Sequence, residues 1–235
     1  MPRELLKIAN LDAWYGESHI LHGVELTVQE GEVVTLLGRN GAGRTTTLRA
    51  IMGLIGARTG SILIGGVETV RLAPHRIARL GLGYCPEERG IFSSLSAEEN
   101  LMLPPLLDAR RAMPVEEIYE MFPNLRERAA SPGTRLSGGE QQMLAVARIL
   151  RTGARLLLLD EISEGLAPVI VQKLGEMIRT LKAKGFTVVL VEQNFRFAAP
   201  LADRFYVMER GRILRHFEQS QLASHMGMLQ EFLGV

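Results

Sequence analysis

The sequence predicts an α/β protein built on a central, mostly parallel sheet. One observation is that "EVVTLLG" (32–38) leads through a glycine-rich loop into "TTTLRAIMGL" (45–54), where apolar residues recur at helical spacing. A second is that "RLLLLDE" (155–161) and "FTVVLVEQ" (186–193) are continuous apolar runs, as in strands that are buried on both faces. Between them lies a long amphipathic segment, so the simplest interpretation is a strand–helix–strand crossover.

The first 85 residues otherwise have the character of strands. "LLKIANLDAWY" (5–15) and "GVELTVQ" (23–29) are β-rich stretches, and "GSILIGGVETV" (60–70) predicts a strand pair. A helix over 74–80 and a short strand "LGYC" (82–85) are expected to follow.

Helical patterns dominate from residue 88 to residue 153. "SAEENLML" carries Ser96 as a cap with Glu99 three positions later, and "PVEEIYEMF" (114–122) begins on a proline. We therefore expect a helical insert here. After the crossover helix, which Gly185 should terminate, strands are expected in "RFYVMERGRILRHF" (204–217) and a last helix over 219–233.

Composition excludes several classes of protein. The 235 residues are 46% hydrophobic, and 27 Lys and Arg nearly balance 26 Asp and Glu, so the net charge of +1 does not point to nucleic acid as a partner. Cys85 is the single cysteine, and we expect it to be packed rather than reactive. No signal peptide or membrane span is evident, which favours a cytoplasmic setting in which any membrane is reached through a partner.

The loop "GRNGAGRT" (38–45) resembles the phosphate-binding pattern G-x-x-x-x-G-K-[ST]. Backbone N–H groups at the start of a helix bind phosphate, glycines allow close approach, and Thr45 is placed to bind Mg²⁺ through its hydroxyl. A glycine-rich structural turn is the alternative. The residues expected to contact phosphate are Gly38, Arg39, Asn40, Gly41, Ala42, Gly43, Arg44, Thr45 and Thr46.

Two carboxylates follow the apolar run at 156–159. Asp160 and Glu161 stand where a buried strand would emerge at its carboxyl end, the edge at which α/β sheets bind ligands. An aspartate there can hold Mg²⁺, and a glutamate can activate an attacking water. A strand end that simply meets solvent would leave the same pattern.

"LSGGEQQ" (136–142) resembles the signature motif of ABC ATPases, and the resemblance extends over nearly the whole chain. It implies a P-loop NTPase of the ABC type, a single domain over 1–235 with an N-terminal antiparallel β subdomain and the helical subdomain at 88–153. The cofactors that the resemblance implies are ATP and Mg²⁺. A Ser-capped helix start is itself a second phosphate site, which in this family faces the nucleotide of the opposite subunit. The residues concerned are Ser137, Gly138, Gly139 and Glu140.

The same resemblance assigns further roles. Tyr15 corresponds to the adenine-stacking aromatic, with Trp14 as the alternative. Glu161 would activate water, and Thr45 and Asp160 would hold Mg²⁺. Residues 163–167 would cross the dimer interface.

Three positions depart from the general ABC pattern. Glu87 replaces a metal-contacting glutamine, and a carboxylate is also a hard oxygen ligand. Gln193 replaces the histidine that senses the γ-phosphate, and an amide still donates a hydrogen bond. Arg44 replaces lysine, keeping the charge but changing its shape to a planar fork. We expect a functional ATPase, whose turnover the arginine would slow.

Within the family, "PEERGIF", "DEISEGLAP" and "LVEQN" are most similar to ATP-binding subunits of branched-chain amino acid importers. This resemblance implies a second ABC ATPase subunit, identical or paralogous, together with integral permease subunits and, indirectly, a solute-binding protein. The chain would then lie on the cytoplasmic face of the membrane. The alternatives are an importer of urea or short-chain amides, a catalytically weakened regulatory subunit, and an ABC ATPase of translation or DNA repair.

Overall fold

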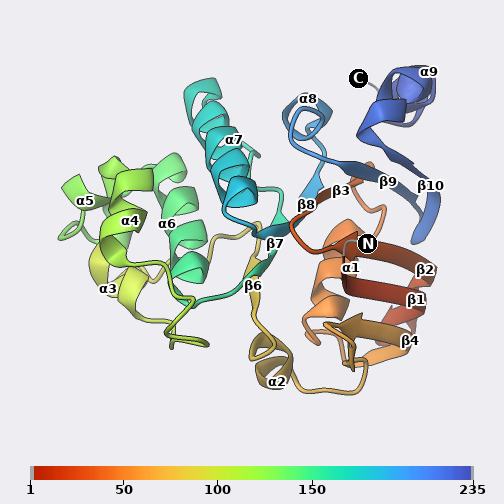
Figure 1. The fold of residues 1–235 in the computed structure, drawn as a ribbon, viewed down its shortest axis with the longest axis horizontal. Coiled ribbons are helices and arrows are strands. Elements are labelled where there is room, and N and C mark those ends of the chain that lie inside the picture. The colour runs from red at the N-terminus through yellow and green to blue at the C-terminus, as the bar shows by residue number, and fades with distance from the viewer. Residues whose placement is uncertain (1–2, 234–235) are drawn as a thin grey trace.

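The computed structural model describes residues 3–233 and contains two sheets flanked by helices (Figure 1). The strands are β1 Glu4–Tyr15, β2 Ser18–Gln29, β3 Val33–Leu37, β4 Ala57–Ile64, β5 Val67–Glu68, β6 Leu82–Cys85, β7 Leu156–Asp160, β8 Thr187–Glu192, β9 Arg204–Glu209 and β10 Arg212–Glu218. The helices are α1 Arg44–Ile51, α2 Pro74–Ala78, α3 Ala97–Met102, α4 Val115–Met121, α5 Pro123–Glu127, α6 Gly138–Arg151, α7 Pro168–Ala183, α8 Phe195–Ala198 and α9 Leu222–Leu233, with 3₁₀ turns η1 Gly133–Arg135 and η2 Gln219–Gln221.

The central sheet has the strand order β10-β9-β3-β8-β7-β6. Strands β6, β7, β8, β3 and β9 pair in parallel, and only β10 is antiparallel to its neighbour. The strands β3, β7 and β8 are buried along their full length. The prediction of a mostly parallel α/β sheet is therefore confirmed.

Side chains of the central strands alternate between two cores because successive residues of a strand point to opposite faces. Leu157 and Leu159 of β7 pack on the helical side, whereas Leu156 and Leu158 pack toward the N-terminal sheet. Each core contains apolar residues of several neighbouring elements, which explains why these strands lack polar positions in their sequence.

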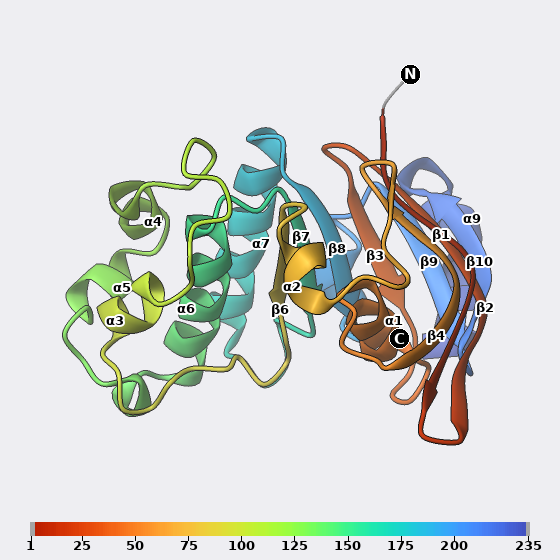
Figure 2. The same cartoon turned by 90° about the horizontal axis from the view of Figure 1, so that it is seen from below.

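The second sheet, β2-β1-β4-β5, is antiparallel throughout and contains the N-terminal strands, as expected. Helix α1 shares a core with the inner face of this sheet and with β3. In Figure 2 the two sheets stand side by side with α1 between them. The loop that precedes α1 is thereby fixed from both sides.

Helices α3 to α6 gather at the end of the molecule that lies away from the antiparallel sheet (Figure 1). Complete capping boxes begin α3 at Ser96 and α6 at Ser137, because each serine accepts from the backbone N–H three residues on. Pro114 is the N-cap of α4, so this helix begins one residue later than the sequence suggested.

Two further boundaries differ from expectation. Helix α2 ends at Ala78 rather than residue 80, since the N–H groups of Leu80 and Gly81 bond to carbonyls three residues back and tighten the chain into a turn. The predicted last helix is divided into η2 and α9. Within residues 3–233, no helix combines the length and the apolar character that crossing a membrane requires.

Candidate functional site

The glycine-rich loop connects the carboxyl end of β3 to the first turn of α1. Gly41 and Gly43 have φ angles of 79° and 107°, which L-residues rarely adopt. A Cβ on Gly38 would lie 2.5 Å from the carbonyl oxygen of Met208 in β9. Glycine is therefore required at these positions for the turn and for packing.

This loop borders a cleft of ≈ 410 Å³. The residues that line it are Tyr15, Ile20, Asn40, Gly41, Ala42, Gly43, Arg44, Thr45, Thr46, Glu87, Glu161 and Glu164. Gly38 and Arg39 instead line a smaller hollow with Met208 on another side of the loop. The start of α1 thus opens into the cleft with its N–H groups and its positive dipole end.

Asp160 is the last residue of β7, and a hydrogen bond from the Thr45 hydroxyl connects it to the phosphate loop. The Thr45 hydroxyl donates to its Oδ1 at 3.1 Å, and the Tyr84 hydroxyl donates to its Oδ2 at 3.1 Å. Asp160 is fully buried, and burial raises its pKa, although the two hydroxyl donors act in the opposite direction. The hydrogen bond from Thr45 joins two of the three expected Mg²⁺ ligands, Thr45 and Asp160, and the third, Glu87, lines the cleft together with Thr45.

Arg44 lies across the cleft on Glu161. Its Nη2 is 2.7 Å from Glu161 Oε1 and donates more weakly to Asn40 Oδ1 at 3.3 Å. The arginine is only 4% exposed, and its Nη1 is buried without a partner. A buried guanidinium nitrogen that lacks an acceptor can donate to an anion that enters the cleft.

Glu161 directly follows β7 and has an unusual backbone conformation. Its φ is 48°, and its N–H donates to the carbonyl of Val191 at 2.9 Å. Burial raises the pKa of its carboxyl, Arg44 lowers it, and Glu164, Glu87 and Asp160 raise it again. A carboxylate with a raised pKa at the edge of a phosphate loop is suited to accept a proton.

Gln193 lies in an adjoining cavity of ≈ 520 Å³ that shares Glu161 with the cleft. It follows β8, and its side chain is exposed. Gln193 therefore does not line the nucleotide cleft itself, and it borders the neighbouring cavity, to which Glu161 and Glu164 are common.

Glu192 is a buried carboxyl beside Gln193. It accepts from the backbone N–H of Ser163 at 3.0 Å and from the Ser163 hydroxyl at 2.7 Å. Burial raises its pKa to about 7, and the bonds from Ser163 oppose that rise. Glu192 thus anchors the loop that starts at Ser163 to the end of β8.

The signature residues lie at the start of α6, and none of Ser137, Gly138, Gly139 and Glu140 is among the residues lining the cleft. Ser137 and Glu140 bond to each other's backbone N–H groups. A Cβ on Gly139 would meet Ile170 of α7 at 2.9 Å, so this glycine allows the two helices to pack closely.

The two candidate aromatics for adenine have different surroundings. Tyr15 is 43% exposed and lines the cleft. Trp14 stacks on His19 with ring centroids 4.4 Å apart. Tyr15 is therefore the side chain that a base in the cleft could contact.

Sequence reasoning missed three residues of the site. Tyr84 and Glu192 became visible only when strand pairing brought β6 and β8 beside β7. Glu164 borders both cavities, and its position three residues after Glu161 was a signal that could have been used.

These features define a nucleotide-binding protein of the phosphate-loop class, because a glycine-rich loop opens a helix beside an acidic strand end. The family model described as ABC transporter matches residues 21–164, so the chain belongs to the ABC transporter family. The predictions of this family and of its fold are confirmed.

Relatives support the same assignment. The chain is 42% identical over 232 residues to the high-affinity branched-chain amino acid transport ATP-binding protein BraG of Pseudomonas aeruginosa, covering 98% of this chain and 100% of BraG. It is 32% identical to the probable branched-chain amino acid transport ATP-binding protein LivF of Archaeoglobus fulgidus, covering 98% and 99% of the two chains.

A nucleotide-free ATP-binding cassette from an ABC transporter superposes with a TM-score of 0.83 at 21% identity, covering 99% of both chains. A dimeric cassette in a post-hydrolysis state with ADP and Pi superposes with a TM-score of 0.79 at 26% identity, covering 92% of this chain and 99% of the cassette.

Proposed function

We propose that this chain is the ATP-hydrolysing subunit of an ABC importer that takes up branched-chain amino acids. The observation that carries the proposal is the meeting of Thr45, Asp160 and Glu161 at one phosphate loop. The names of the relatives BraG and LivF support this solute class.

ATP would bind with its phosphates on the N–H groups of residues 41–46 and its adenine against Tyr15. The residues present fit Mg²⁺, because the Thr45 hydroxyl and the carboxylates of Asp160 and Glu87 are hard oxygen donors around one cleft. Bound Mg²⁺ would neutralise charge on the phosphate oxygens.

Hydrolysis requires Glu161 to be released from Arg44. An incoming phosphate competes for the guanidinium, since the arginine fork binds phosphate as readily as carboxylate. Once released, Glu161 would take a proton from the attacking water, and Gln193 would donate to the γ-phosphate. Arg44 would then stabilise the charge of the phosphates.

Each nucleotide site would be formed by two chains, one with the phosphate loop and the other with the signature residues. Ser137 to Glu140 lie outside the cleft of their own chain, so their helix start is available to the nucleotide of a partner subunit. The solved dimeric cassette with ADP and Pi supports this arrangement. Residues 88–153 would act as a helical subdomain that carries the signature, and Ser163–Ala167 would cross the interface.

The partner subunits would be a paralogous or identical ATPase, integral permeases and, indirectly, a solute-binding protein. Exposed apolar side chains support contact with a permease, because Phe92, Met102, Leu103 and Leu106 follow the Glu87 segment and are each about half exposed. The chain would work on the cytoplasmic face of the membrane.

A regulatory subunit with weakened catalysis is the second candidate, and the Arg44–Glu161 ion pair favours it. If the pair persists after ATP binds, Glu161 cannot activate water. The two functions then differ in turnover and not in nucleotide binding.

Phosphate release from Mg²⁺-ATP by the purified chain tests the proposal. We expect turnover by the parent, a loss of about 10²–10⁴-fold in Glu161→Gln, and parental turnover in the control Glu116→Gln, an exposed residue of α4. Equal rates in the parent and Glu161→Gln would refute the assigned catalytic role. ATP binding without turnover, restored by Arg44→Lys, would establish the regulatory alternative.

A further inference from the structure

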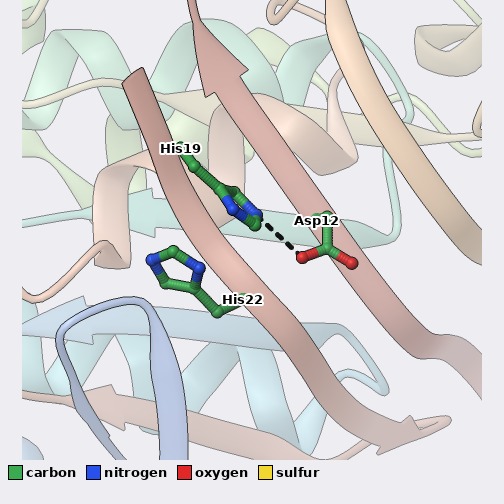
Figure 3. Close-up of side chains that lie close together, drawn as sticks. All are labelled: Asp12, His19 and His22. Carbon is green, nitrogen blue, oxygen red and sulfur yellow. Dashed lines mark hydrogen bonds and ion pairs between the residues drawn. The ribbon is translucent and has the colours of Figure 1, made fainter. Parts of the chain in front are cut away.

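A cluster of metal-binding side chains lies on the β1–β2 hairpin, outside the nucleotide cleft. In Figure 3 the His19 side chain of β2 points to Asp12 of β1, and the His22 ring lies next to His19; one ligand atom of each residue lies within 4.8 Å of the other two. His19 Nε2 is 2.8 Å from Asp12 Oδ1. None of the three lines the cleft.

The backbone explains why two histidines three residues apart share one face. Strictly alternating strand residues at i and i+3 would point to opposite faces. The β1–β2 register shifts between Leu11 and Ala13 and again between Ala13 and Trp14, and Gly23 has a φ of 64°. Such irregularities re-aim side chains, and here they place the His19 and His22 rings 4.0 Å apart.

Neighbouring groups hold both histidines. Trp14 stacks on His19 at an interplanar angle of 16°. A metal binds in the plane of an imidazole, so this stack and metal ligation are compatible. The His22 backbone N–H donates to the Gly211 carbonyl at 2.9 Å, which fixes the base of that side chain.

We propose that Asp12, His19 and His22 form a Zn²⁺ site that ties β1 to β2. Two imidazoles and one carboxylate are a ligand set typical of zinc, with bonds of about 2.0–2.2 Å. Imidazole ligands favour zinc over Mg²⁺, which prefers oxygen donors. The ligand atoms lie within 4.8 Å of one another, so side-chain rotations would have to bring them onto one Zn²⁺, and water would complete a tetrahedral shell.

The position of Trp14 supplies a local probe, because it is the only tryptophan in the chain. Zn²⁺ is titrated into the untagged, nucleotide-free full chain while Trp14 fluorescence is recorded, and equilibrium dialysis counts the bound metal. We expect one Zn²⁺ per chain, a saturable change in fluorescence, and no change with Mg²⁺ in excess.

Three variants remove one ligand each: Asp12→Asn, His19→Gln and His22→Gln. We expect each to weaken Zn²⁺ binding by at least the roughly tenfold that the loss of an outer-shell partner costs, because a direct ligand is removed. His22→Gln leaves the His19–Trp14 stack in place and so keeps the probe intact. His75→Gln, an exposed histidine of α2, is the matched control and should bind as the parent does.

Circular dichroism and thermal unfolding without metal confirm that each variant is folded. Absent binding in the parent, or parental Zn²⁺ affinity in all three ligand variants, would overturn the site. Because the readouts are bound metal and Trp14 fluorescence, the result does not depend on ATP hydrolysis.

Discussion

Arg44 and Glu161 form a buried ion pair across the nucleotide cleft, with Nη2 and Oε1 2.7 Å apart. The arginine replaces the lysine that the phosphate loop requires, and its longer arm reaches the residue expected to activate water. Arg44, the expected cation for phosphate, and Glu161, the expected base for hydrolysis, are therefore paired with each other. Nucleotide binding has to exchange one partner of Arg44 for another.

Removing the charge of Glu161 should increase affinity for ATP. In Glu161→Gln the guanidinium no longer has a carboxylate to release, and a hydrogen bond to a charged group contributes about 1.5–3 kcal/mol. We expect the Kd of ATP, measured without Mg²⁺ to prevent turnover, to fall by about tenfold. An unchanged Kd would show that phosphate does not compete with Glu161.

A double-mutant cycle with Arg44→Lys separates competition from simple repulsion. The compact lysine ammonium lacks the fork that binds the carboxylate, so Glu161→Gln should improve ATP affinity less in the Arg44→Lys background. Equal gains in both backgrounds would assign the effect to the negative charge alone. Glu116→Gln, made in the parent and in the Arg44→Lys background, shows how much ATP affinity changes when an exposed carboxylate is neutralised elsewhere.

Gly38→Ala should destabilise the protein. The added Cβ would lie 2.5 Å from the Met208 carbonyl oxygen and 2.9 Å from the Ala42 Cβ, so either β9 or the loop must shift. Overpacking of this kind costs about 1–3 kcal/mol in the free energy of unfolding. Denaturant unfolding measures the loss, and ATP affinity should fall with it.

Gly56→Ala is the matched control for that experiment. A Cβ at Gly56 meets nothing within 4 Å, and its backbone does not require glycine. We expect its free energy of unfolding to stay within about 0.5 kcal/mol of the parent. If both variants lose a similar free energy of unfolding, the contact with Met208 does not explain the effect of Gly38→Ala.

The elements of the fold that could be predicted from the sequence are those whose signals are local. The buried runs that became β7 and β8, and the capping boxes at Ser96 and Ser137, depend only on neighbouring residues. The end of α2 at Ala78 could not be predicted in this way, because a tight turn competes there with one more helical turn.

The residues of the candidate site that the sequence could indicate are those that belong to motifs. Thr45 of the phosphate loop and Asp160 of the acidic strand end were expected to hold the same Mg²⁺, which stays a prediction, and in the structure a hydrogen bond joins them. Tyr84 and Glu192 were missed because their roles arise from strand neighbours that are distant in sequence. The Arg44–Glu161 pair links residues 117 positions apart, and neither motif contains a signal for it.

Glu192 should make stability fall as pH rises. Burial raises the pKa of this carboxyl from an ordinary 4.5 to about 7, so the folded chain retains a proton that the unfolded chain loses. This contribution is fully present below pH 4.5 and is lost as pH rises through about 7. Glu192→Gln keeps both contacts with Ser163 and does not titrate.

The free energies of unfolding of the parent and Glu192→Gln are compared from pH 4 to pH 8. The difference should grow in favour of the variant with rising pH, to at most about 3 kcal/mol at pH 8. The difference between the two chains removes the contributions of groups that do not interact with Glu192; Glu161 and Arg44 do interact with it. If this difference in the free energy of unfolding does not change with pH, the folded chain does not retain a proton on Glu192.

Ser137→Ala and Ser96→Ala compare two helix caps of the same construction. Each serine closes a capping box, at α6 and α3 respectively, so each alanine should cost about 1 kcal/mol in the free energy of unfolding. Only Ser137 belongs to the helix start that we propose for a partner's phosphate. We therefore expect turnover to fall in Ser137→Ala by more than in Ser96→Ala.

The comparison depends on assay conditions in which both variants are folded, which far-UV circular dichroism verifies. Turnover is measured over a range of chain concentrations, because a contact between subunits also changes the concentration at which activity appears. Ser137→Ala should require a higher chain concentration than Ser96→Ala before turnover appears. If both variants lose turnover equally and only in proportion to stability, Ser137 is a helix cap without a role across the interface.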